Sequence, residues 1–127
     1  MSSIVDEPND AEESSSADES IFAAMDGIAE AVGKNMQDER ILLERLQRLR
    51  EARASGMSWH DTLGGEEQPG TMQLTSRLLS RLAVASGALR RVMARALREE
   101  GASTLTIAKL FGVTHQRVSS LLRRRER

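Results

Sequence analysis

Residues 104–123 read TLTIAKLFGVTHQRVSSLLR, and this stretch decides the fold that we predict for the C-terminal part of the chain. The apolar residues recur at the spacing of two short helices joined by a tight turn, with the small Ala108 where the helices approach and Gly112 in the turn. Glycine adopts a positive φ without steric cost, which suits Gly112 to that position. The pattern predicts a helix-turn-helix rather than a plain helical hairpin with a solvated basic face. The side chains expected to face inward are Ile107, Ala108, Leu110, Val113, Val118 and Leu121.

Two hydroxyl residues stand where these two helices are expected to begin. Ser103 and Thr114 each precede a run with helical periodicity, and a hydroxyl oxygen at that position accepts a backbone N–H of the first turn. A cap at Thr114 places His115, Gln116 and Arg117 in the first turn of the second helix. That turn is the part of a recognition helix that usually meets base edges.

The side chains expected to face outward from the second helix carry hydrogen-bond donors and acceptors. Gln pairs bidentately with adenine, and Arg with guanine, in the major groove of DNA. We therefore predict base contacts from His115, Gln116, Arg117 and Ser120. Contacts to phosphates set the register of a protein on the duplex. The residues predicted for that role are Thr104, Thr106, Lys109, Thr114, Arg123, Arg124 and Arg125.

The formal net charge of −1 over 127 residues conceals a strong polarity along the chain. Residues 1–20 hold seven acidic and no basic residues, whereas residues 70–127 hold twelve basic and three acidic residues. A basic half is the electrostatic footprint of a protein that binds a polyanion. The acidic, serine-rich residues 1–20 cannot bury enough apolar surface to offset the entropy of ordering, so we predict a disordered tail there.

Helical periodicity extends over most of the remaining chain. The predicted fold class is therefore all-α, a helical bundle with a C-terminal helix-turn-helix and a disordered acidic N-terminal tail. Residues 21–55 form a helical segment, in which Gly33 and Asn35 are expected to divide two helices or to kink one. A leucine stripe in this segment either packs on the protein's own core or forms the seam of a dimer. Its members are Leu42, Leu43, Leu46 and Leu49.

Residues 56–70 form a connection that contains a short capped helix. Ser58 and Asp61 have the S-x-x-D spacing of a helix start, and Gly64 and the glycine after it end the helix. Trp59 is the one large aromatic residue here, and we expect it to anchor the turn against the helices.

Residues 71–127 form the predicted helical DNA-binding domain. Apolar residues recur at helical spacing up to residue 100, with Ser86 and Gly87 as the site of an expected kink or turn. Gly101 suits the position after the end of a helix, just before the helix-turn-helix at 104–123.

Several classes of function find no support in the residues. The chain has no cysteine, and its two histidines, His60 and His115, lie in different segments without a nucleophile or further metal ligands at suitable spacing. No phosphate-binding loop is present, so we expect no enzyme, no metal site and no cofactor. One Trp, two Phe and no Tyr argue against a stacking platform for single strands. No apolar run approaches the ~20 residues of a membrane span, and no secretory signal is recognisable, so we expect a cytoplasmic protein associated with the nucleoid.

Residues 57–125 resemble a family of small actinobacterial helix-turn-helix proteins. The residues that carry this resemblance are Gly56-Met57-Ser58-Trp59, Leu89-Arg90-Arg91, Ala94-Arg95-Ala96-Leu97, Glu100-Gly101, Ile107-Ala108, Leu110-Phe111-Gly112-Val113-Thr114 and Gln116-Arg117-Val118-Ser119. The last two segments are also similar to sigma-factor region 4, with its G-V-x-x-x-R-V spacing. The resemblance implies DNA binding and transcriptional regulation without a known ligand. No sigma-factor region 2 is recognisable, so we do not expect this chain to direct promoter opening alone.

The function that we predict is sequence-specific binding of duplex DNA in transcriptional regulation. A single helix-turn-helix makes few base contacts, and such proteins usually bind DNA as two-fold symmetric dimers. A homodimer is therefore part of this hypothesis. The alternative is a protein-interaction module that acts on RNA polymerase or a sigma factor, with the arginines facing an acidic partner. Steep weakening of binding with salt distinguishes DNA binding from the alternative.

Overall fold

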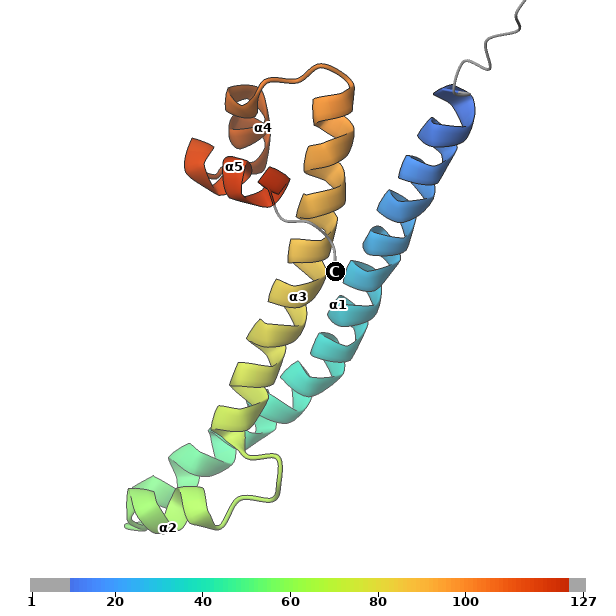
Figure 1. The fold of residues 1–127 in the computed structure, drawn as a ribbon. Coiled ribbons are helices and arrows are strands. Elements are labelled where there is room, and N and C mark those ends of the chain that lie inside the picture. Colours follow the sequence, from blue (N-terminus) through green and yellow to red (C-terminus); the bar gives the residue numbers. More distant parts are fainter. Residues whose placement is uncertain (1–9, 124–127) are drawn as a thin grey trace, which may run out of the picture. The chain divides into compact units, whose positions relative to one another are not determined.

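A computed structural model describes residues 10–123, and every regular element in that range is an α-helix (Figure 1). The all-α class is thus confirmed for the described residues. Among these helices, none combines the length and the apolar character needed to cross a membrane. The helices are α1 (Asp10–Ala54), α2 (Trp59–Gly64), α3 (Thr71–Glu99), α4 (Thr104–Phe111) and α5 (His115–Arg123).

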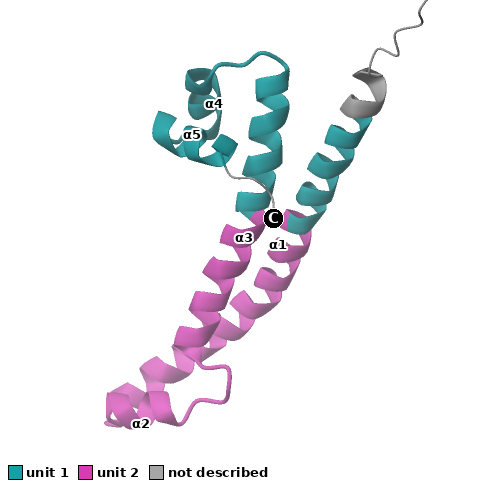
Figure 2. Ribbon diagram, viewed as in Figure 1, with its two compact units in different colours: residues 1–27, 86–127 teal, residues 28–85 magenta. Residues whose placement is uncertain are grey.

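The chain forms two compact units, and α1 and α3 each contribute to both (Figure 2). Unit 1 comprises residues 1–27 and 86–127, and unit 2 comprises residues 28–85. The boundary between the two units falls inside α1 and inside α3, not in the connection at 56–70 that the sequence places between two helical segments.

In unit 2, α1 and α3 pack as an antiparallel hairpin that is held by a polar network. Asn35 is buried and donates from Nδ2 to the Leu78 carbonyl oxygen at 3.1 Å. Arg81 Nη1 donates to Asn35 Oδ1 at 2.8 Å and to Asp38 Oδ2 at 2.9 Å. Sliding one helix along the other would leave these desolvated groups unpaired, which is strongly unfavourable. The network therefore fixes the register of the hairpin.

The same network explains why α1 runs through Gly33 and Asn35 as one helix. Of the two alternatives predicted at these residues, the division into two helices is wrong, because α1 is one helix. Asparagine disfavours helix interiors because its side chain competes for nearby backbone groups, but here α3 engages the amide instead. α3 likewise continues through Ser86 and Gly87 without the turn that the sequence suggested.

α1 begins at Asp10, inside the segment for which disorder was predicted. In unit 1, residues 16–20 and 92–99 line a common pocket of about 410 Å³, so this part of α1 lies beside α3. Extending a helix that is already anchored adds one hydrogen bond per residue without a new nucleation step. The structure thus differs from the prediction over residues 10–20, and residues 1–9 lie outside the described part.

The connection contains the short helix that the sequence predicted. The Ser58 hydroxyl oxygen accepts the backbone N–H of Asp61 at 3.0 Å, which confirms the cap, and α2 ends at Gly64. Trp59, however, is 54% exposed and does not anchor the turn by burial. Its ring instead lies under the Arg53 guanidinium, 5.2 Å from the ring centroid.

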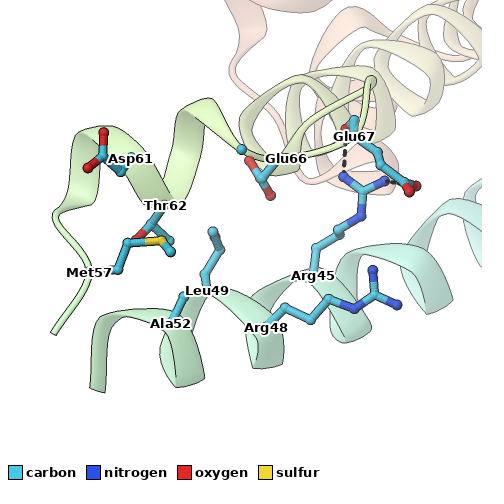
Figure 3. A pocket seen from close by; sticks show the side chains of 10 residues that line it. Arg45, Arg48, Leu49, Ala52, Met57, Asp61, Thr62, Glu66 and Glu67 are labelled. Carbon is cyan, nitrogen blue, oxygen red and sulfur yellow. Dashed lines mark hydrogen bonds and ion pairs between the residues drawn. The ribbon is translucent and has the colours of Figure 1, made fainter. Parts of the chain in front are cut away.

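Arg45 ties the segment before α3 to α1 (Figure 3). This buried side chain donates from Nη1 to the carbonyl oxygens of Glu67 at 2.7 Å and Pro69 at 3.1 Å. A pocket of about 320 Å³ lies beside it, but the guanidinium is committed to these backbone carbonyls and lies 3.7 Å from Glu67 Oε2. The Glu66 carboxylate accepts both the backbone N–H and the hydroxyl of Thr71, the first residue of α3. These contacts are structural, holding the loop in place.

Arg45→Ala should lower the free energy of unfolding by about 1–3 kcal/mol, because it removes the donor of two partly buried carbonyls. Arg48, three positions on, lines the same pocket but is exposed, so Arg48→Ala should change stability by at most ~0.5 kcal/mol. Urea denaturation followed by circular dichroism measures both values. Equal losses for the two variants would contradict the role given to Arg45.

Candidate nucleic-acid interface

α4 and α5 share one small apolar core with the C-terminal part of α3 in unit 1. Its centre is Ala94, Ile107, Ala108 and Val118, all buried. The partly buried side chains packed around it are Leu97, Ala102, Phe111, Val113 and Leu122. The small side chains of Ala94 and Ala108 allow the three helices to approach closely, and this core fixes which face of α5 points outward.

The turn between α4 and α5 has the backbone conformation expected from its glycine. Gly112 has φ 66° and ψ 32°, in the left-handed region, and its N–H points to the Ala108 and Lys109 carbonyl oxygens. The N–H of Val113 donates to the Ala108 carbonyl oxygen at 3.1 Å. The predicted positive φ is confirmed, and the last carbonyls of α4 are satisfied inside the turn.

Both predicted caps are present at the starts of α4 and α5. The Ser103 hydroxyl oxygen accepts the backbone N–H of Thr106 at 3.1 Å. The Thr114 hydroxyl oxygen accepts the backbone N–H of Arg117, also at 3.1 Å. α5 therefore starts at His115, as the sequence indicated.

One residue predicted for the core lies on the surface. Leu110 is 65% exposed, and Phe111 packs against the core in its place. The buried face of α4 follows Ile107, Ala108 and Phe111, which lie three and four positions apart. Leu110 projects beside that face, so the prediction for this residue is wrong.

The outward face of α5 carries three exposed polar side chains in one row. Gln116, Ser120 and Arg123 are separated by four and three positions, which places them on the same side of the helix. Val118 and Leu121 are buried on the opposite side. This row contains two of the predicted base contacts and one predicted phosphate contact.

The other two predicted base contacts lie at the edges of this row. His115 is exposed beside residues 98–105, where it helps to line a shallow hollow of about 500 Å³. Arg117 is exposed on the other edge of α5. The four predicted base contacts therefore belong to one helix but do not form a single row.

The predicted phosphate contacts have varied surroundings. The Thr104 hydroxyl accepts from Arg98 Nη1 at 3.0 Å, and the Thr106 hydroxyl lies 3.0 Å from the Ser103 hydroxyl. Lys109 is exposed near the end of α4, and the Thr114 hydroxyl is used as a cap. Arg124 and Arg125 lie outside the described residues.

Arg98 is a candidate contact that the sequence reasoning missed. It lies in the last turn of α3 and lines the same hollow as Ser103 and His115. Its bond to Thr104 holds the guanidinium beside the first turn of α4. The only signal in the sequence was a basic residue six positions before Thr104, which by itself does not distinguish it from neighbouring arginines.

The sequence of this region carries a single sign of charge. Residues 102–123 contain Lys109, Arg117 and Arg123 but no Asp or Glu. An anionic ligand that approaches the outward face of α5 therefore meets no carboxylate from α4, the turn or α5 itself.

Comparison of the chain with protein-family models, with curated proteins and with solved structures gave no significant match.

Gly112→Ala should lower the free energy of unfolding by about 1–2 kcal/mol, because a Cβ is disfavoured in the left-handed conformation. Gly33 provides the matched control, since it lies inside α1 with no atom near the position of an added Cβ. Gly33→Ala should raise the free energy of unfolding by about 0.5–1 kcal/mol. Urea titration compares the two variants. A neutral or stabilising Gly112→Ala would show that the turn does not need this conformation.

Proposed function

We propose that α4, the turn and α5 form a DNA-binding helix-turn-helix, and that the protein binds duplex DNA sequence-specifically to regulate transcription. The observation that carries this proposal is the exposed row of Gln116, Ser120 and Arg123 on α5. These side chains offer donors and acceptors on one side of a helix whose other side is fixed in a core.

The dimensions of α5 suit insertion into the major groove. An α-helix with its side chains is roughly 10–12 Å across, and the major groove of B-DNA is ~12 Å wide. The groove readily admits a helix of this size. The left-handed turn at Gly112 and the cap at Thr114 hold the start of α5 in a defined place, which lowers the entropy lost on binding.

Different side chains take different parts in the proposed contact. Gln116 is suited to adenine and Arg117 to guanine, while Ser120 reaches a base one turn further along. His115 adds a contact at the edge of the helix. Lys109 and Arg123 lie at the ends of α4 and α5, where phosphates of the flanking backbone would lie, and Arg98 joins them beside α4.

The composition of the row favours a sequence-specific contact over a purely electrostatic one. A binder without sequence preference relies on basic side chains along the phosphate backbone. Here, uncharged Gln116 and Ser120 occupy the middle of the outward face, with basic residues beside and beyond them. Amide and hydroxyl groups contribute little to charge neutralisation but discriminate between base edges.

The experiment that tests the proposal is selection of the full chain against a random pool of duplex DNA at 50 and 200 mM salt, with sequencing of the bound fraction. An enriched motif together with steep salt dependence supports the proposal. Binding without enrichment would contradict the sequence-specific part of it. The absence of binding at both salt concentrations would contradict it entirely and favour a module that contacts RNA polymerase or a sigma factor.

On a selected site, Arg117→Ala should weaken binding by about 1–3 kcal/mol and relax the preference at one base position. Lys109→Ala should weaken selected and random sequences alike and reduce the slope of log K against log salt by ~0.9. Fluorescence anisotropy at several salt concentrations measures both effects. Arg40→Ala, at an exposed arginine of α1 in unit 2, is the control and should leave affinity unchanged. Identical losses on both kinds of DNA for Arg117 and Lys109 would contradict this division of roles.

A further inference from the structure

The hairpin of unit 2 buries few apolar side chains and exposes many, and polar side chains take part in the contact between its helices. Throughout residues 28–85, all of which are described, the buried hydrophobic residues are Ala31 and Leu74 alone. Asn35 and Arg81 occupy the interior beside them. Twelve large apolar side chains in this range are exposed, and seven of them, which we call the apolar face, are Val32, Met36, Leu43 and Leu46 on α1, and Met72, Leu79 and Leu82 on α3.

Helix geometry places these seven residues on one side of the hairpin. Each follows by one position a residue of the helix–helix interface, as Met36 follows Asn35 and Leu79 follows Leu78. One residue corresponds to a rotation of about 100° around an α-helix. Because α1 and α3 run in opposite directions in unit 2, equal rotations on the two helices turn both sets toward the same side.

The register of the hairpin also brings the exposed residues of the two helices level with one another. The bond from Asn35 to the Leu78 carbonyl places these two residues level with one another. Counting in opposite directions along the two helices from this pair places an apolar residue of α1 within two residues, about 3 Å, of one on α3 at three levels: Leu43 with Met72, Met36 with Leu79, and Val32 with Leu82. Between the first two levels, Glu39 on α1 lies within the same distance of Ser76 on α3.

We infer that a second copy of this chain covers the apolar face, so that two hairpins form a four-helix bundle. The exposed fractions of the seven side chains correspond to roughly 700 Å² of apolar surface per chain. The largest patch on a typical monomer is about 300–600 Å², and a standard interface buries ~800 Å² per partner. The size of the face thus fits a dimer, and pairing supplies the core that the hairpin lacks.

The levels also determine how the two copies are aligned. With the same ends together, each apolar level meets its own copy, and Glu39 meets the Ser76 hydroxyl of the second chain. With one hairpin turned end for end, the Leu43 level meets the Val32 level, and Glu39 falls against the apolar Met36 level. A carboxylate placed there would be desolvated without a partner. The second copy is therefore aligned with the same ends together.

This inference concerns unit 2 and does not rest on the proposed DNA contacts of unit 1, so each can fail without the other. Sedimentation equilibrium of the full chain at 5–100 μM should give twice the mass of one chain. Leu79→Glu places a charge in the apolar face and should raise the dissociation constant of the dimer at least tenfold, so that the mean mass falls toward that of one chain as the protein is diluted.

Val84→Glu is the matched control. Val84 is 71% exposed and Leu79 is 70% exposed, five positions apart on the same helix, but Val84 does not lie on the apolar face. The Val84→Glu variant should remain a dimer. A monomeric wild-type chain throughout this concentration range, or equal effects of the two substitutions, would overturn the inference.

Thermal unfolding of the wild-type chain tests the inference even if the Leu79→Glu variant does not fold. The Tm of the wild-type chain should rise with protein concentration, as it does when association stabilises the native state. A Tm that is independent of concentration would overturn the inference in the same way.

The alignment is tested by spin-label distances, for which a chain without cysteine is well suited. Gln37→Cys and Glu51→Cys place single labels at exposed positions of α1. With the same ends together, the two label-to-label distances should be similar. An end-for-end arrangement centred near residue 37 would separate the labels at 51 by about 40 Å more than those at 37, and that result would overturn the alignment.

Discussion

The hydrogen bonds of Asn35 across the hairpin fix how α1 and α3 align in unit 2. Its amide group joins the Leu78 carbonyl oxygen to the Arg81 guanidinium, and Asp38 balances the charge of that arginine. These groups fix the register because they are withdrawn from water and paired only in this arrangement. They also occupy space between the helices, where Ala31 and Leu74 are the only buried apolar residues of residues 28–85. The polar network thus lies beside an exposed apolar face in the same hairpin.

Features set by neighbours in sequence were predictable, and features set by distant partners were not. Ser58, Ser103 and Thr114 cap helices, and Gly112 adopts a positive φ, because each acts within four residues of itself. Asn35 misled the prediction because its partners lie 43 and 46 positions away.

The burial of each leucine in the stripe also depends on packing that the sequence does not show. Leu42 and Leu49 are half-buried, whereas Leu43 and Leu46 are exposed, because two adjacent faces of α1 are apolar. The helical spacing of the leucines does not determine which of these two faces packs against α3. In the candidate interface, the sequence alone predicted the residue types that α5 carries on its outward side. The separation of His115 from the row of Gln116 and Ser120 required the position of α5 on its core.

The proposed function depends most directly on the outward face of α5 being the surface that meets DNA. Amide chemical shifts of the ¹⁵N-labelled chain, recorded during titration with a selected duplex, test this residue by residue. The largest changes are expected at Gln116, Ser120 and Arg123, and small changes at Met57 and Trp59 in unit 2. Changes concentrated in unit 2, with those three residues unaffected, would contradict the proposed contact.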